Sequence, residues 1–256
     1  MTQTHATLSA IVITRNEAHN LHDCLQSMHG LVDEIIVVDS QSTDNTVAIA
    51  QQHGAKVSQP ADWPGFGPQK NRALELATCD WVFSIDADER VTPELAEEIK
   101  QVLRTNQDNA YEIPRLSWYC GRFMQHSGWQ PDYVLRLFKR NAAKFTNDLV
   151  HERLLSNVST QKLKGILLHF SFTNFSQVLS KINAYSEASA KQAYAKGKRA
   201  NVFTAVGHGF WSFFRTYFLK AGFLDGQHGL ALAISNAEGT YYRYIKLWLL
   251  SDNEEK

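Results

Sequence analysis

Two carboxylates, Asp86 and Asp88, flank one small residue directly after the apolar run Trp81 to Ile85. Such a pair at the end of a strand can reach one divalent cation, and Mg²⁺ or Mn²⁺ prefers oxygen ligands together with phosphate oxygens. The alternative is that both side chains cap the turn into the next helix. The apolar run before the pair favours a site for a metal ion and a diphosphate.

Polar residues also follow two other apolar runs. The run Ala10 to Ile13 leads into the segment Thr14 to Glu17, and the run Glu34 to Val38 ends at Asp39. Ligands of open parallel sheets bind beyond the carboxyl ends of the strands, so these residues are predicted to converge. Asp39 is suited to accept a hydrogen bond from a base N–H or a ribose hydroxyl. Its alternative role is to begin the turn Ser40 to Asp44.

Two basic residues are candidates for neutralising a diphosphate, Arg15 and Lys70. Lys70 is favoured because it follows the flexible loop Pro64 to Pro68. The alternative for both is a solvated loop cation. The Gly-x-Gly in that loop lacks the GxGxxG frame between a strand and a helix, so it is weak evidence for a dinucleotide.

A scaffold of alternating strands and helices is predicted around these residues. Strands are expected at residues 10–14, 34–38, 56–58, 81–85 and 111–113. Helices are expected at 44–53, 69–77 and 92–103, and an earlier helix has Leu21, Cys24, Leu25 and Met28 on one face and ends at Gly30. This alternation predicts an α/β fold in which a mostly parallel sheet carries helices on both faces.

The rhythm changes after Ser117. An aromatic segment from Trp118 to Trp129 precedes strands expected at 134–139 and 150–155, and helices follow Asn174 almost to the end. We therefore predict a first domain at residues 1–173, whose substrate-specific part covers about 117–173, and a helical region at 174–256. Between Phe170 and Leu250 nine Lys and Arg face three Asp and Glu, a net charge of +6, and the remainder carries −6.

Composition excludes several classes of protein. The 26 Lys and Arg balance the 26 Asp and Glu, so no net field attracts a nucleic acid, and no nucleic-acid partner is expected. The three cysteines lack CxxC spacing, which fits a reducing compartment without a zinc site or disulfides. Neither a signal peptide nor a spanning helix is predicted, since Arg215 and Lys220 interrupt the most apolar region, Val202 to Leu224.

Three motifs, in order and spacing, resemble the family 2 glycosyltransferases with the GT-A fold: Ala10 to Glu17, Ile35 to Thr46, and Phe83 to Glu89. Three later pieces are similar to a subgroup, the lipopolysaccharide core β-1,4-glucosyltransferases: Trp129 to Tyr133, Arg136 to Phe138, and Val150 to Glu152. The resemblance covers nearly the whole chain and is strongest from Ser9 to Val91.

The resemblance implies a UDP-sugar site. It assigns Asp39 to the uracil, Asp86 to the ribose or the metal, Asp88 to the Mg²⁺ or Mn²⁺ that bridges the diphosphate, and Thr14, Asn16 and Glu17 to the nucleotide pocket. Many family members have a second Asp where this chain has Ser40, so the uracil assignment depends on Asp39 alone.

The implied reaction is an inverting, β-linked transfer of glucose from UDP-glucose to a heptose of the lipid-linked lipopolysaccharide core. Two other classes stay open at this stage: a metal-dependent phosphohydrolase or nucleotidyltransferase, and a non-catalytic sugar-nucleotide-binding protein. Nucleophilic Asp phosphatases usually carry their acid pair after the first strand, whereas here the pair follows the fourth.

Two acids are candidates for the base that activates the acceptor hydroxyl. The family commonly places this acid after the strand that follows the metal motif, which points to Glu152, with His151 able to orient it. Asp132 is the competitor. The alternative for either acid is an ion pair with Arg136 or Arg153 that shapes the acceptor loop.

The aromatic residues suggest contacts with the acceptor. Four of them could stack on sugar rings or simply form core: Trp118, Tyr119, Phe123 and Trp129. The basic aromatic segments 210–215 and 241–246 are suited to an anionic leaflet, and a packed helical subdomain is the alternative. A cytoplasmic enzyme, peripheral on the inner membrane, is the resulting expectation.

Overall fold

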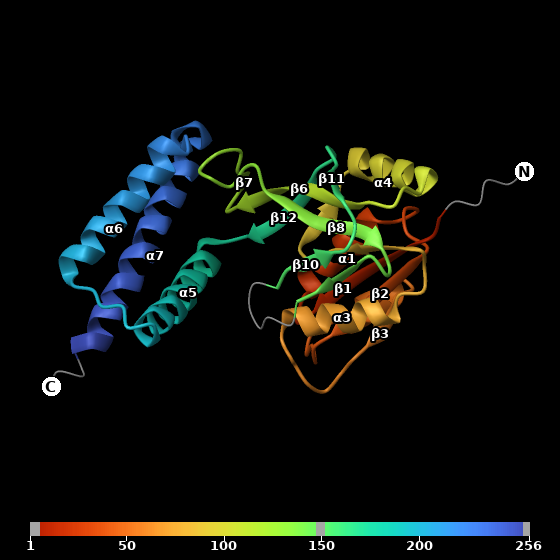
Figure 1. The fold of residues 1–256 in the computed structure, drawn as a ribbon, viewed down its shortest axis with the longest axis horizontal. Coiled ribbons are helices and arrows are strands. Elements are labelled where there is room, and N and C mark those ends of the chain that lie inside the picture. Colours follow the sequence, from red (N-terminus) through yellow and green to blue (C-terminus); the bar gives the residue numbers. More distant parts are fainter. Residues whose placement is uncertain (1–5, 147–151, 253–256) are drawn as a thin grey trace, which may run out of the picture. The chain divides into compact units, whose positions relative to one another are not determined.

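A computed structural model of the chain describes residues 6–146 and 152–252 (Figure 1). The chain divides into two units, the first formed by residues 1–115 and 132–169 and the second by residues 116–131 and 170–256. The segment 116–131 thus belongs with the C-terminal helices, whereas the sequence analysis assigned most of it to the acceptor part of the first domain.

The first unit begins with the expected alternation of strands and helices. Its first elements are β1 (Leu8–Thr14), α1 (Ala18–Ser27), β2 (Glu34–Asp39), α2 (Thr46–Gln52), β3 (Lys56–Ser58), α3 (Phe66–Leu76) and β4 (Trp81–Ser84). The four strands lie in the order β3-β2-β1-β4 and pair in parallel. This half of the sheet is the parallel layer that the sequence predicts.

The second half of the sheet is antiparallel, so the sheet as a whole is mixed. Beyond β4 the order continues β8-β6-β12-β5, and β8 (Tyr133–Lys139) runs antiparallel to both β4 and β6 (Ala110–Tyr119). β12 (Leu167–Phe172) is antiparallel to β5 (Glu89–Val91), a short strand that the sequence analysis did not predict.

Smaller strands complete the first unit. β9 (Ala143–Phe145) pairs antiparallel with β10 (Leu154–Ser156), and β11 (Thr160–Lys162) pairs in parallel with β6. The strand expected at 150–155 therefore begins later, and residues 147–151, including His151, lie outside the described residues.

Helices cover both faces of the sheet. One core cluster joins β1 and β4 to α1, α2 and α4 (Pro93–Thr105), and a second cluster joins β1, β2 and β8 to α3. β1 is buried along almost its whole length, as expected for a strand covered on both sides. Thr92 and Pro93 begin α4 as predicted, because the Thr92 hydroxyl accepts a hydrogen bond from the Leu95 N–H at 3.3 Å.

The second unit is mainly helical. It contains β7 (Arg122–Phe123), α5 (Phe175–Ala195), α6 (Val202–Phe214) and α7 (Gly226–Asp252), with a π-helical turn at Arg215–Leu219 and a 3₁₀ turn at Gly222–Asp225. Asn174 and Asn201 cap α5 and α6 through their side chains. Within the described residues, no helix combines the length and apolar character needed to cross a bilayer.

The aromatic residues from Trp118 to Trp129 pack against one another inside this unit. Tyr119 is buried, its ring lies 5.8 Å from that of Trp129, and its hydroxyl lies 3.1 Å from the Ser235 hydroxyl. Trp118 contacts Phe123 with ring centroids 4.8 Å apart. The structure thus gives Tyr119 the core role that the sequence analysis kept as the alternative to sugar stacking, whereas Trp118, Phe123 and Trp129 stay partly exposed.

Glu34, the first residue of β2, is a buried carboxylate that contacts residues of β1 and β3. Glu34 on β2 accepts hydrogen bonds from the Ser9 hydroxyl and from both the N–H and the hydroxyl of Thr78, and it pairs with Lys56 at 2.6 Å. Burial raises the pKa of Glu34, but the hydrogen bonds from Lys56, Ser9 and Thr78 outweigh it and lower the pKa to about 2 from its ordinary 4.5. The ionised form therefore stabilises the fold.

We predict that Glu34→Gln removes an acid-dependent part of the stability. Because the folded pKa lies below the unfolded value, this part is fully present above about pH 4.5 and is lost as the pH falls toward 2. The free energy of unfolding at neutral pH should fall by about 3 kcal/mol, and its slope between pH 4.5 and pH 2 should flatten. Urea unfolding across this range measures both, with exposed Glu75→Gln as the control. An unchanged slope contradicts the prediction.

Candidate active site

The carboxyl ends of β1 and β2 bring Thr14 and Asp39 together. The two residues are register partners, and the Thr14 hydroxyl donates to the Asp39 carboxylate at 2.9 Å. Asp39 is fully buried and also accepts from the Ser42 N–H at 2.9 Å, the Ser42 hydroxyl and the Gln59 amide at 3.2 Å. Asp39 thus begins the turn to α2, which was its alternative role.

The loop after β1 is tied to the loop after β2. Asn16 has a positive φ of 56°, a conformation that Asn tolerates better than most residues. Its N–H donates to the Ser42 hydroxyl at 2.7 Å, and its side-chain oxygen accepts from the Thr43 N–H at 2.8 Å. The neighbouring Arg15 is exposed. Two polar loops are thereby held together at one edge of the sheet.

A buried arginine on β8 organises the acid pair after β4. The Arg136 guanidinium donates to Asp86 and to Glu89, the latter at 2.6 Å, and the Asp86 N–H donates back to Glu89 at 2.9 Å. Glu89 is fully buried and Arg136 is 5% exposed. Arg136 therefore does not form the ion pair with Asp132 or Glu152 that the sequence analysis weighed, because two other acids already share its guanidinium.

The charges of this cluster shift one another. Burial raises the pKa of Asp86, but the Arg136 and Lys70 cations outweigh burial and hold it well below its ordinary range. Burial raises the pKa of Glu89, and the adjacent Asp86 adds to this rise while Arg136 opposes it. Burial alone would lower the pKa of Arg136, but the carboxylates of Asp86 and Glu89 outweigh burial and raise it above its ordinary value. Arg136 therefore stays charged.

Lys70 links the acid pair to the acceptor-side acid. From α3, its ammonium lies 3.0 Å from an Asp86 oxygen and 3.0 Å from a Glu152 oxygen. The lysine is 7% exposed. Three residues singled out from the sequence, Lys70, Asp86 and Glu152, are therefore brought into one site.

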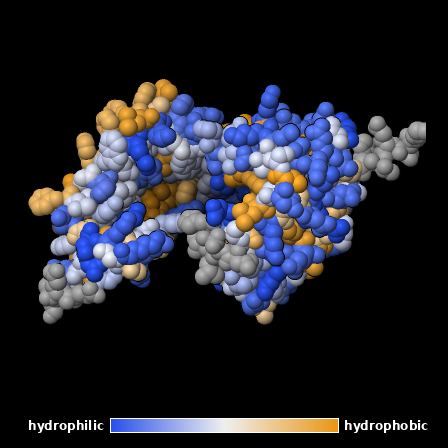
Figure 2. Space-filling model, viewed as in Figure 1, coloured by the Kyte–Doolittle hydropathy of each residue, from blue (hydrophilic) through white to orange (hydrophobic). Residues whose placement is uncertain are grey.

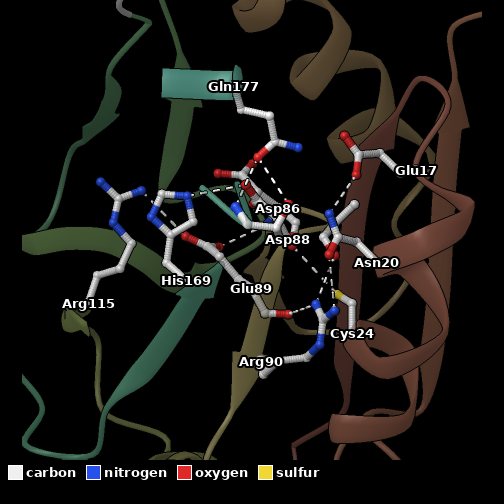
Figure 3. A network of polar contacts seen from close by, with 12 residues as sticks. Glu17, Asn20, Cys24, Asp86, Asp88, Glu89, Arg90, Arg115, His169 and Gln177 are labelled. Atoms are coloured by element: carbon white, nitrogen blue, oxygen red, sulfur yellow. Dashed lines mark hydrogen bonds and ion pairs between the residues drawn. The ribbon is translucent and has the colours of Figure 1, made fainter. Parts of the chain in front are cut away.

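Asp88 has a different environment from Asp86. One Asp88 oxygen lies 3.3 Å from Nε2 of His169 on β12, and both side chains are partly exposed (Figure 3). The negative charge of Asp88 also acts on Glu17. Burial raises the pKa of Glu17, the hydrogen bond from Asn20 opposes the rise, and Asp88 and Asp44 add to it.

The donor set at Asp88 fits a divalent cation that shares its coordination with phosphate. In the parts of the chain that the structure describes, no group of three or more His, Cys, Asp and Glu side chains could hold a metal alone. Mg²⁺ is commonly bound through one or two carboxylates with phosphate oxygens and water. Asp88 can supply such a carboxylate, and His169 beside it offers an imidazole nitrogen as a second donor, whereas the Asp86 carboxylate is engaged by Arg136 and Lys70.

Asp132 is held by a different arginine. Arg115 Nε donates to its carboxylate at 2.9 Å, and the Arg115 N–H donates to the Asp132 carbonyl at 2.7 Å. A further Arg115 nitrogen lies 3.5 Å from Glu89. The predicted alternative of an ion pair for Asp132 is correct in kind, with Arg115 in place of Arg136 or Arg153.

The sequence analysis did not assign Glu89, Arg115 or His169 to the site. It named Arg136 only as a possible partner of Asp132 or Glu152, not of Asp86 and Glu89. Arg136 did carry a signal, since it is the one charged residue within the apolar stretch Val134 to Phe138. A lone charge in a buried strand calls for a buried partner. His169 offered no such signal, because its neighbour Asp88 is distant in sequence.

Comparisons with known proteins identify the family of this chain. Residues 9–176 match the family model described as Glycosyl transferase family 2. An uncharacterized glycosyltransferase of Rickettsia felis is 34% identical over 252 residues, which cover 94% of this chain and 89% of that protein. The lipopolysaccharide core biosynthesis glycosyltransferase LpsC of Rhizobium meliloti is 30% identical over 257 residues, 93% of each chain.

A solved structure extends the likeness to the fold. The crystal structure of S. aureus TarS superposes with a TM-score of 0.50 and 17% identity, covering 94% of this chain and 50% of that one. The fold is therefore the GT-A fold of glycosyltransferases. More specifically, the chain belongs to glycosyl transferase family 2.

We predict that Arg136→Met is strongly destabilising, because it leaves the buried Glu89 without its closest cation. The free energy of unfolding should fall by about 3–5 kcal/mol, and adding Glu89→Gln should recover part of the loss by removing the buried charge. Urea unfolding measures the changes. Lys139→Met, on the same strand but in a partly exposed pair with Asp108, is the matched control and should cost about 1 kcal/mol or less. A loss no larger than that of the control contradicts the prediction.

Proposed function

We propose that this chain transfers glucose from UDP-glucose to a heptose of the lipopolysaccharide inner core, with inversion and a β linkage. One observation carries the proposal: the Lys70 ammonium lies 3.0 Å from both Asp86 and Glu152. This contact joins the acid at the predicted donor site to the acid predicted to act on the acceptor. In-line transfer needs both partners held in one small space.

The nucleotide is proposed to bind over the tied loops after β1 and β2, with Thr14, Asn16 and Glu17 in the pocket. Asp39 would accept the uracil N–H. Of its four hydrogen bonds, the one from the exposed Gln59 amide is the longest, at 3.2 Å, and is the easiest to exchange for a base N–H. Arg15, exposed beside this pocket, is available to the diphosphate.

The leaving diphosphate is proposed to lie between Lys70 and Asp88. Asp88 and His169 would hold Mg²⁺ or Mn²⁺, which supplies positive charge opposite the diphosphate oxygens. Asp86, with its charge matched by Arg136 and Lys70, would fix Lys70 and accept a hydrogen bond from a ribose hydroxyl. The Lys70 ammonium has three N–H donors, so it can contact phosphate while keeping both carboxylates.

Glu152 is proposed as the base that removes the proton of the acceptor hydroxyl through its carboxylate. Its contact with Lys70 places it next to the donor groups, whereas Asp132 is held by Arg115 through both side chain and backbone. A carboxylate fixed in position raises the rate of such a proton transfer by about 10²–10⁴-fold.

The acceptor class is taken from the similarity to LpsC, a lipopolysaccharide core biosynthesis glycosyltransferase. Such an acceptor is linked to lipid, which would place the reaction at the cytoplasmic face of the inner membrane. Purified protein with UDP-glucose, Mn²⁺ and a deacylated heptose core should release UDP only when the acceptor is present. Parallel reactions with UDP-galactose test the donor, and no acceptor-dependent release with any sugar nucleotide overturns the proposal.

In the same assay we predict that Glu152→Gln lowers kcat by at least about 100-fold while the Kd for UDP stays within about twofold of wild type. The matched variant Asp132→Asn should retain most of its kcat, because Asp132 would act only through Arg115. If Asp132→Asn loses turnover and Glu152→Gln keeps it, the assignment of the base is wrong.

We predict that Asp88→Asn weakens UDP binding only when a divalent cation is present, because its carboxylate would act through the metal. Calorimetric titration with UDP should show at least about a tenfold loss of affinity in Mn²⁺ and none in EDTA. Asp132→Asn should bind as wild type in both conditions. Equal affinity of the wild-type protein for UDP with and without Mn²⁺ would sink the metal assignment.

A further inference from the structure

The helix α6 packs with its small residues inward and its large apolar residues outward. Its buried residues are Ala205, Gly209 and Ser212. A Cβ on Gly209 would lie 3.3 Å from the Ala237 carbonyl of α7, so the two helices approach closely there. A helix of a water-soluble protein normally turns its large apolar side chains toward the core. In α6 this order is reversed.

The exposed side of α6 and of the turns after it is strongly apolar. Phe203 is 87% exposed and Phe210 is 71% exposed, with Val206 between them on the same face. The same apolar character continues along the chain at Trp211, Phe218, Leu219, Phe223 and Leu224, each of which is about half exposed. Figure 2 shows these apolar residues gathered along α6 and the turns that follow it. We call this set, with Phe203, Val206 and Phe210, the α6 face.

Exposed cations lie at both ends of α6. Lys196 and Lys198 precede the helix, and Arg215 and Lys220 follow it. The nearest acid in sequence, Asp225, is fully buried and accepts hydrogen bonds from the N–H groups of Gln125 and His126. The charge presented around the α6 face is therefore positive.

The second basic aromatic segment, 241–246, has a different role. Lys246 donates to the Asn183 carbonyl at 2.9 Å and to the Ser186 hydroxyl at 2.9 Å, and Tyr244 stacks on His208 with ring centroids 4.2 Å apart. These contacts join α7 to α5 and α6. Tyr244 and Lys246 therefore take part in helix packing, the alternative kept for this segment, while Tyr242 is 37% exposed.

We propose that the α6 face inserts into the headgroup region of an anionic phospholipid bilayer. Exposed aromatic and aliphatic side chains between flanking cations match the two layers of such an interface, an apolar boundary below charged headgroups. Neighbouring exposed apolar side chains of this number mark an interaction surface. The positive charge favours an anionic leaflet over a second copy of the same cationic face. This inference deepens the proposed function, since it names the surface that would bring the enzyme to a lipid-linked acceptor.

Co-sedimentation of the full chain with vesicles tests the proposal. Vesicles of phosphatidylglycerol and phosphatidylethanolamine should bind the protein, and neutral phosphatidylcholine vesicles should bind it at least tenfold more weakly. Phe203→Ser with Phe210→Ser should lower binding to anionic vesicles at least tenfold. The matched control, Phe175→Ser with Leu179→Ser, alters two α5 residues that are 46% and 45% exposed and should bind as wild type.

The contribution of charge is measured separately. Lys198→Gln with Arg215→Gln, one cation from each end of α6, should weaken binding to anionic vesicles severalfold at low salt and have less effect at high salt. Thermal unfolding of each variant confirms that it is folded, which is expected because the altered side chains are exposed.

Absence of vesicle binding at low salt would overturn the proposal. If sedimentation velocity then shows a dimer that Phe203→Ser with Phe210→Ser abolishes, the α6 face instead binds a second copy of the chain. Vesicle binding needs no sugar nucleotide, so it can fail or succeed independently of the transfer reaction. Conversely, turnover of a deacylated acceptor should not change in the α6-face variants, which separates the loss of docking from the loss of the proposed activity.

Discussion

A single buried guanidinium sets the geometry of the site. The Arg136 guanidinium lies between the carboxylates of Asp86 and Glu89; Arg136 and Glu89 are buried, and Asp86 is partly exposed. An ion group of this kind survives burial only if every charge is matched, and removing one member leaves another uncompensated. The antiparallel pairing of β8 with β4 makes the contact possible. It aligns Phe83 with Leu137, so Arg136 falls beside the end of β4, just before the acid pair.

This constraint divides two acids that look equivalent in sequence. Asp86 is neutralised by Arg136 and Lys70, so it acts mainly on other side chains. Asp88 projects toward His169 and is partly exposed, which leaves its oxygens accessible to a cation or ligand. In the proposed function, the Asp-x-Asp pattern would therefore serve two purposes, positioning through Asp86 and ligand contact through Asp88.

The part of the fold that depends on local pattern was predictable. The buried run of β1 and the Thr92-Pro93 start of α4 follow from residues near one another in sequence. The convergence of Thr14 with Asp39 follows from the alternation of strands and helices, which predicts parallel strands whose carboxyl ends meet. The antiparallel half of the sheet was not, because hydrophobic periodicity identifies a strand without naming its neighbour. For the same reason the partners of Arg136 and Asp88, which lie on strands far apart in the chain, could not be assigned from the sequence. Lys70 and Glu152 were each singled out, but their shared contact depends on how α3 packs.

The helical unit shows how packing, rather than composition, decides what a segment does. Residues 210–215 and 241–246 both combine aromatic and basic side chains, and both contact the rest of the unit, but the first segment leaves Phe210 71% and Trp211 53% exposed. The difference lies in the small residues of α6. With Ala205, Gly209 and Ser212 against α7, the helix comes too close for large side chains to fit between, so Phe203 and Phe210 must point away. Burial of small side chains contributes little hydrophobic free energy. The stability of α6 then depends on its Asn201 cap and on close backbone packing, and the larger apolar area of the helix is left available to something outside the chain.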